Sequence, residues 1–347
     1  MDVTPQQARE WVRLFPRHPA LWLLVAAALV ALLARRAQPP DQLPRPDLTS
    51  LSATDADSAD RDTRYGWLSR KERARYQPLA DRLPPPAGFM RVAVAAGSFG
   101  DWLRHLPCAP PDTPVRDGHG KPLRPADDTA LAAVIELRPG GPRLLGACNM
   151  LIRLRGEYLW SAGRLDGLVL HFTSGAEYPW KRFAAGERPG VRGREVTWKL
   201  NEDPAATRAV FTAYLEMLFA YSSSISLEHD TLPAGDAPIL PGDLFVISGR
   251  PGHAVQVLDV AEGPAGAADA PRATAILIGE GHTPPQSFHV LKGSDGSAWF
   301  IVQPPRPDRP GAPIALPTWP LVEWRSRRTW AEPAAPAVTS QPTPPSR

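Results

Sequence analysis

Three residues in the middle and second half of the chain could together perform acyl-transfer chemistry. They are Cys148, His253 and Glu280, in that order along the sequence. A thiolate nucleophile needs a neighbouring base to take its proton, and a third polar group to hold the imidazole ring in place. The order predicts Cys148 as nucleophile, His253 as general base and Glu280, or alternatively His282, as the orienting group. The corresponding activity would be a cysteine hydrolase of peptide or amide bonds, an amidase or peptidase.

Each of these assignments has a structural alternative. A helix beginning near residue 144 would place Cys148 past its first turn, where the helix dipole stabilises a thiolate less. Free cysteine is also a frequent core residue, and Cys108, the only other cysteine, could form a disulfide with it. His253 could instead be held by a loop carbonyl.

His253 is positioned by the segment 240–259, which has the pattern of a β-hairpin. Two short β-branched runs, residues 244–247 and 254–257, flank a turn that contains Gly, Pro and Ser. Gly252 allows close backbone approach just before the histidine. Asp243, which precedes the first run, and Trp160, which lies upstream, are further candidate substrate contacts, together with His282.

The remaining periodicity predicts an α+β domain, with a mostly antiparallel sheet packed against two to three helices. Helices are expected at about residues 69–83, 98–106, 144–160 and 205–221, and strands at 89–95, 134–137, 168–172, 191–198 and 273–279.

Composition excludes several functional classes. The net charge is only +3, and the basic residues form no stripe of the kind that nucleic-acid-binding proteins carry. The sequence has no phosphate-binding glycine loop and no pair of histidines at metal-ligand spacing, so we expect no cofactor and no metal. Proline is abundant, at 42 of 347 residues, which favours linkers and loop-rich packing over long helices.

The N-terminal region has the pattern of a membrane anchor. A short amphipathic segment with arginines precedes residues 20–34, an apolar run without a polar residue. As a helix this run would extend about 22 Å, which suits an uncleaved anchor with snorkelling arginines or the apolar part of a signal peptide. We predict residues 1–37 as a cytoplasmic amphipathic segment and signal anchor.

Four further regions follow from composition. They are a disordered linker at 38–63, a connecting segment at 64–86, a globular domain at 87–330 and a disordered tail at 331–347.

Several motifs resemble one uncharacterised bacterial family, whose members tend to be exported. The motifs are GSFGDWLRHLP at residues 97–107, RLRGEYL at 153–159, FTSG at 172–175, PGD at 241–243 and GHAV at 252–255. Together they resemble the domain of unknown function 4846 over about residues 86–330. The resemblance implies export, and together with the predicted anchor at residues 20–34 it leads us to expect a bacterial inner-membrane protein with a single span and an extracytoplasmic domain.

The PGD to GHAV segment is also similar to the papain-like cell-wall hydrolases of the NlpC and CHAP kinds. This second similarity implies a papain-like arrangement and a substrate such as peptidoglycan. The chain departs from it in the long separation between Cys148 and His253. Cys148 also lies one position away from the cysteine that the uncharacterised family leads us to expect.

A second class of function is a non-catalytic envelope module that binds a glycan or a protein partner. Its surface would use aromatic side chains, for which the candidates are Trp160, Trp180, Trp198 and Tyr178. Geometry separates the two classes, because a catalytic thiol must lie within about 4 Å of a ring nitrogen of His253.

Overall fold

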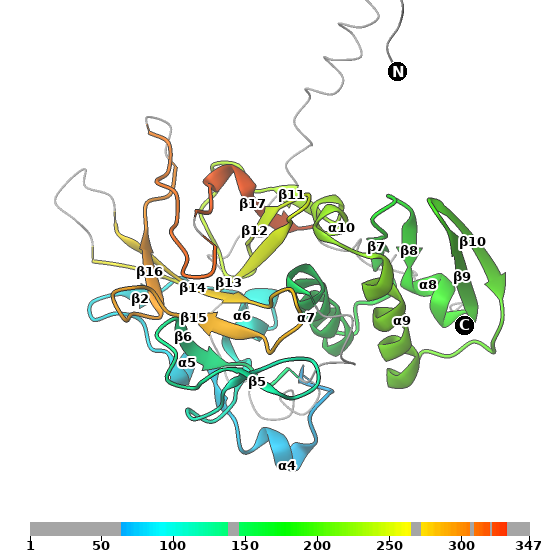
Figure 1. Ribbon diagram of the computed structural model, residues 1–347, viewed down its shortest axis with the longest axis horizontal. Coiled ribbons are helices and arrows are strands. Elements are labelled where there is room, and N and C mark those ends of the chain that lie inside the picture. Colours follow the sequence, from blue (N-terminus) through cyan, green and yellow to red (C-terminus); the bar gives the residue numbers. More distant parts are fainter. Residues whose placement is uncertain (1–63, 138–145, 265–271, 306–308, 320, 332–347) are drawn as a thin grey trace, which may run out of the picture. The chain divides into compact units, whose positions relative to one another are not determined.

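The computed structural model describes residues 64–137, 146–264, 272–305, 309–319 and 321–331 (Figure 1). The predicted anchor at residues 20–34, the linker before residue 64 and the tail beyond residue 331 lie outside these ranges. Within them, no helix combines the length and the apolar character needed to cross a membrane.

The helices of the described ranges are mostly short, as the high proline content predicts. They are α4 (Arg70–Arg73), α5 (Leu79–Arg82), α6 (Phe99–Arg104), α7 (Ala147–Ser161), α8 (Trp180–Ala184), α9 (Arg208–Tyr221), α10 (Ser224–His229) and the 3-10 turn η3 (Trp324–Ser326). The predicted N-cap of α6 is confirmed, since the Ser98 side chain accepts a hydrogen bond from the Asp101 backbone N–H.

Nine strands form one antiparallel sheet. Its main path has the order β11 (Thr231–Pro233), β17 (Arg327–Trp330), β12 (Leu244–Ile247), β13 (His253–Glu262), β14 (Thr274–Glu280), β15 (His289–Leu291) and β6 (Leu131–Val134). Off this path, β2 (Met90–Arg91) pairs with β13, and β16 (Trp299–Val302) pairs with β14. The fold is therefore α+β with an antiparallel sheet, as the sequence predicts.

Four small two-stranded units lie outside the main sheet. They are β1 (Gln77–Pro78) with β3 (Pro107–Cys108), β4 (Val115–Arg116) with β5 (Pro122–Arg124), β7 (Val169–His171) with β8 (Glu177–Pro179), and β9 (Glu187–Arg192) with β10 (Glu195–Leu200).

The two faces of the main sheet bury different hydrophobic clusters. On the helix face, Ala254, Leu258 and Leu277 pack in one large cluster with the apolar residues of α7. On the opposite face, Val255 and Ile278 belong to a second cluster with the segments 309–319 and 321–324, which we call the strap. Because neighbouring residues of a strand point to opposite faces, the position of a residue along β13 or β14 decides which face its side chain occupies.

A β-bulge interrupts this alternation in the middle of β13. The pairing of β13 with β14 shifts between Val257 and Asp259, which leaves Leu258 as the extra residue. Beyond the bulge, Asp259 accepts hydrogen bonds from Arg91 and Arg104, each with a nitrogen-to-oxygen distance of 2.6 Å. Asp259 is fully buried, so these two arginines supply its counter-charge.

Several predicted boundaries differ from the structure, and two of the differences change how the domain is built. The segment 64–86, predicted to be a connector, is part of the domain, because Tyr65, Leu68 and Leu79 are buried in the large cluster. Tyr65 and Leu68 are three residues apart, and Leu79 follows eleven residues later. These few positions form no sustained periodic stripe in the sequence. The single strand predicted at 191–198 is instead part of the β9–β10 hairpin, which turns at Gly193 with a positive φ of 59°.

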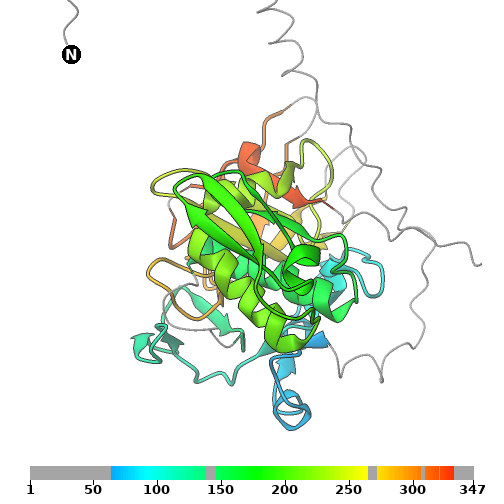
Figure 2. The same cartoon turned by 90° about the vertical axis from the view of Figure 1, so that its right-hand side faces the viewer.

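The aromatic residues proposed as a binding surface are packing residues. Tyr178 and Trp180 are buried, and Tyr178 stacks on Tyr214 of α9 at a centroid distance of 4.5 Å. Trp160 stacks on Phe211 at 4.9 Å, and Trp198 stacks on Tyr178 at 5.6 Å. These contacts attach α8, α9 and the β9–β10 hairpin to the domain, and the three elements lie side by side in Figures 1 and 2. These aromatic side chains are therefore used for packing within the domain.

Candidate functional site

The strongest polar contact among the predicted site residues joins His253 to Glu280. His253 is the first residue of β13, Glu280 is the last residue of β14, and their Nε2 and Oε2 atoms lie 3.0 Å apart. A carboxylate can only accept, so the ring donates its Nε2–H to Glu280. Nδ1 is then the ring nitrogen that is left to meet a ligand or substrate. His253 is 5% exposed and Glu280 is fully buried.

Glu280 remains ionised although it is buried. Burial alone would raise its pKa, but the hydrogen bond from His253 and the electrostatic attraction to His289 and His253 hold the pKa of Glu280 below its ordinary value. The Thr318 hydroxyl, from the strap, donates a further hydrogen bond of 2.9 Å to the same oxygen, Oε2. The other oxygen, Oε1, is buried and has no hydrogen-bond partner in the described part of the chain.

The neighbour of Oε1 is His289, which faces Glu280 directly across the β14–β15 pair. Its Nε2 lies 3.6 Å from Oε1 and 3.1 Å from Nη1 of Arg124. The Nδ1–H of His289 donates to the Ser287 carbonyl at 3.0 Å, so Nε2 is the acceptor and Arg124 donates to it. Burial lowers the pKa of His289, in agreement with a neutral ring.

Two aromatic rings lie beside His253. Trp319 of the strap stacks on the imidazole with a centroid distance of 5.0 Å and an interplanar angle of 11°. His282 lies with its centroid 5.8 Å away, and its Nδ1–H donates to the Thr283 carbonyl at 2.9 Å. Trp319 and His282 are both partly exposed. The surface around His253 therefore combines one aromatic face with the edge of a second imidazole.

Among the described residues, Cys148 forms no hydrogen bond with this pair. It is the second residue of α7 and belongs to the large cluster on the helix face, whereas His253 and Glu280 share the parity of Val255 and Ile278 and so lie on the strap face. The alternation of side chains between the two faces of the sheet continues to the end of β14. A Cβ built on Gly281 would lie 2.7 Å from the Met150 side chain of α7, while Glu280 points the other way.

The chemistry of the thiol agrees with its position. Burial raises the pKa of Cys148 to about 12, and within the described ranges the thiol forms no hydrogen bond with His253. The predicted onset of the helix also changes, because α7 begins at Ala147 with Gly146 as its N-cap, which places Cys148 in the first turn. Cys148 and Cys108 are both free and buried, so the structure contains no disulfide between them.

The other two predicted contacts lie elsewhere. Asp243 is buried, and its Oδ2 accepts from the Leu240 backbone N–H at 3.2 Å, which closes the turn before β12. This turn lies at the far end of the β12–β13 pair from His253, since Leu244 pairs with Gln256. Trp160 packs on α9, as described above. Neither residue contacts the His253–Glu280 pair.

Comparison with known proteins gives one match. The family model described as domain of unknown function (4846) matches residues 79–320, more than two thirds of the chain. The chain belongs to this family. No curated protein and no solved structure matches the chain. The matched region of domain 4846 contains every residue of the site, from Arg124 to Trp319, together with Cys148.

Four residues of the site are not predicted from the sequence: Arg124, His289, Thr318 and Trp319. The strap carried one usable signal, since Thr318 and Trp319 stand between two prolines in a segment that is otherwise apolar. Arg124 and His289 carry no local signal. His289 reaches the site through the pairing of β15 with β14, and Arg124 reaches it through a side-chain contact from β5, which lies outside the main sheet.

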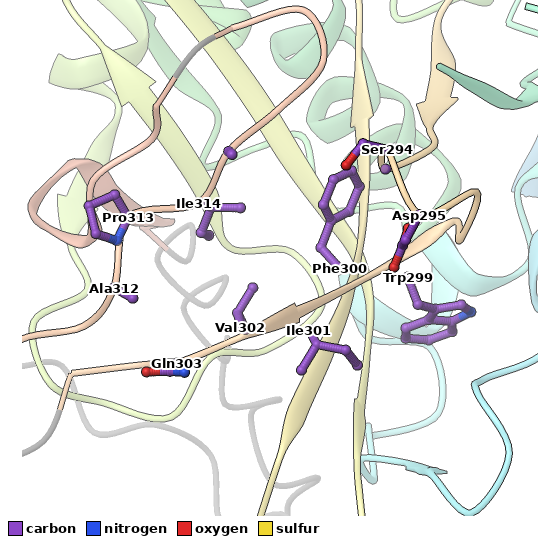
Figure 3. Close-up of a pocket in the computed structure, with 12 residues that line it drawn as sticks. Ser294, Asp295, Trp299, Phe300, Ile301, Val302, Gln303, Ala312, Pro313 and Ile314 are labelled. Atoms are coloured by element: carbon purple, nitrogen blue, oxygen red, sulfur yellow. The ribbon is translucent and has the colours of Figure 1, made fainter. Parts of the chain in front are cut away.

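The described residues of domain 4846 offer no metal centre, because they contain no group of three or more His, Cys, Asp or Glu side chains that could hold an ion. A groove of about 340 Å³ lies beside β16, where Phe300, Ile301 and Val302 face the strap residues 312–315 (Figure 3). Its lining contains none of the predicted site residues, and Asp295 is its one carboxylate.

Proposed function

We propose that this chain is a ligand-binding module of the bacterial cell envelope, with its site at His253 and Trp319. The observation that carries the proposal is the placement of the polar groups. The buried His253–Glu280 pair lies on the strap face, and the thiol that a cysteine hydrolase would need lies on the helix face. The His253–Glu280 pair is therefore buried and held in one orientation, as a ligand-binding group would be. Cys148, the candidate nucleophile, lies on the other face of the sheet.

The chemistry of the pair defines the ligand. With Nε2–H donated to Glu280, Nδ1 of His253 is the nitrogen that meets the ligand, and in the proposed complex it accepts a hydrogen bond from a hydroxyl or an amide N–H. Trp319 offers an aromatic face next to that acceptor. Glycan chains with hydroxyl and acetamido groups have this combination, and peptidoglycan is such a polymer. The apolar run at residues 20–34 and the family resemblance support a location in the envelope.

Binding to purified peptidoglycan sacculi tests the proposal. The full chain, solubilised in mild detergent, is expected to sediment with sacculi, and His253→Gln and Trp319→Ala are expected to lose most of this retention without a matching loss of melting temperature. Ile301→Ala is the control, since Ile301 is 57% exposed in the groove beside β16 and contributes nothing to the site. Retention that is absent in the unaltered chain, or unchanged in both site variants, would overturn the proposal.

A second candidate function is the cysteine amidase or peptidase. The observation that favours it is the position of Cys148 in the first turn of α7, where the helix N-terminus stabilises a thiolate. Its mechanism would require His253 Nδ1 to take the thiol proton, the thiolate to attack an amide carbonyl, and the imidazolium to return the proton to the leaving amine. The thiol would first have to leave the helix-face cluster.

The same sacculi separate the two candidates. Release of soluble fragments that disappears in Cys148→Ser would establish the hydrolase and replace the binding module. Retention without fragment release, unaffected by Cys148→Ser, supports the binding module.

A further inference from the structure

One oxygen of the buried carboxylate at the centre of the site has no hydrogen-bond partner among the described residues. Glu280 is fully buried and ionised, and its hydrogen-bond donors, His253 and Thr318, both contact Oε2. A buried carboxylate oxygen without a partner is costly, so the groups on the side of Oε1 determine how this oxygen is stabilised.

On the side of Oε1, the imidazole of His289 lies between Glu280 and the guanidinium of Arg124. His289 lies 3.6 Å from Oε1, and its Nε2 accepts a hydrogen bond of 3.1 Å from Arg124. The ring therefore lies between the guanidinium and the carboxylate, and the positive charge of Arg124 acts on Glu280 across it. The attraction is mutual, since Glu280 is among the groups that raise the pKa of Arg124, after the hydrogen bond from Arg124 to Asp128.

Arg124 is held in place for this contact. It is the last residue of β5, and its guanidinium donates to both oxygens of Asp128, with Nε–Oδ2 at 3.0 Å and Nη2–Oδ1 at 2.7 Å. This fork fixes the plane of the guanidinium and leaves Nη1 for His289. His289 is fixed in turn by the Ser287 carbonyl and by its place opposite Glu280 in the sheet.

We propose that Arg124, acting through His289, is the counter-ion of Glu280, and that both are positioning residues for His253. In this arrangement Arg124 keeps the carboxylate charged and directed at Nε2 of His253, which keeps Nδ1 free as the acceptor. The inference concerns the site of the proposed function and rests on it for its biological meaning. The geometry that it predicts is measurable without any ligand.

The test observes the His253 ring by nitrogen-15 NMR on the full chain labelled at histidine. A ring N–H held by a buried carboxylate exchanges slowly with water and gives a resolved proton signal. In Arg124→Met we expect this exchange to accelerate by about tenfold or more, as weakening one charge-assisted hydrogen bond allows. Arg124→Lys keeps the charge and is expected to restore most of the protection.

The β4–β5 hairpin supplies a matched control. Arg116 lies on β4, is exposed and donates to the Gly120 carbonyl, so Arg116→Met removes an arginine from the same hairpin without touching His289. It is expected to leave the His253 signal unchanged. His289→Phe is the second variant. It keeps a ring in the sheet but removes the bridge, and His289→Gln restores a donor and an acceptor.

Circular dichroism confirms that each variant is folded before its exchange rate is compared. An unchanged His253 exchange rate in folded Arg124→Met and folded His289→Phe would overturn the inference. Equal acceleration in Arg116→Met would overturn it as well, because the effect would then belong to the hairpin as a whole. Loss of sacculus binding by the unaltered chain would refute the proposed function and leave this result standing.

Discussion

Replacing Glu280 by Gln changes one charge at the centre of the site and almost no volume. The carboxylate accepts hydrogen bonds from His253 at 3.0 Å and from Thr318 at 2.9 Å. Hydrogen bonds to a charged group contribute about 1.5–3 kcal/mol each and neutral ones about 0.5–1.5 kcal/mol. Two such bonds losing their charge should therefore lower the free energy of unfolding by about 2–3 kcal/mol at pH 7.

The pH dependence of this loss has a definite sign. Because the folded-state pKa of Glu280 lies below its ordinary value, the ionised carboxylate stabilises the fold above the unfolded pKa. This contribution is lost as the pH falls below about 4.3 and through the folded pKa. Glutamine does not titrate, so the difference in stability between the two proteins should be largest near neutrality and should narrow on acidification.

Urea denaturation followed by tryptophan fluorescence measures this difference at pH 7, 5 and 4. The midpoint should shift without a change in slope, since the substitution changes stability and not the surface exposed on unfolding. Glu216→Gln is the control, because Glu216 is an exposed carboxylate on α9 and should change the midpoint little. Equal midpoints for the Glu280→Gln variant and the unaltered chain at pH 7 would refute the reasoning.

Three further outcomes are expected. Asp259→Asn should cost about 3 kcal/mol or more in urea denaturation, because it leaves Arg91 and Arg104 without their buried counter-charge; a loss below 1 kcal/mol would contradict that role. Gly279→Ala should cost about 1–3 kcal/mol in the same assay, since the added methyl would lie 2.7 Å from Leu258 and 2.8 Å from Phe288; a variant as stable as the parent would show that these side chains relax. Iodoacetamide at pH 7.5 should leave Cys148 and Cys108 unmodified in the folded chain and label both after unfolding, because burial raises the pKa of each thiol to about 12; rapid labelling of native Cys148, detected by mass spectrometry, would count against its burial.

The sequence predicts the His253–Glu280 pair because both residues are marked locally. His253 opens a hairpin strand after Gly252, and Glu280 ends the next apolar run, so the two ends meet once the strands pair. The position of Cys148 could not be obtained in the same way. Whether a thiol on a helix meets a histidine on a strand depends on which face of the sheet the helix covers, and no local pattern encodes that choice.

The rest of the site depends on contacts between distant segments. Arg124 reaches His289 across 165 residues of sequence, and Thr318 reaches Glu280 across 38. These contacts depend on where the β4–β5 hairpin and the strap lie against the main sheet. Propensity and periodicity describe single elements, so they do not contain this information.

The extra residue at Leu258 affects how relatives of this chain can be aligned. His253 and Asp259 both have odd numbers, yet His253 lies on the strap face and Asp259 contacts the two arginines beyond the bulge. Suppose that an alignment deletes one residue of β13 at the bulge. All residues of β13 on one side of the deletion are then assigned to the wrong face of the sheet. A homologue shorter by one residue in β13 must therefore either lose the arginine clamp or turn its histidine toward α7, the side on which Cys148 is found.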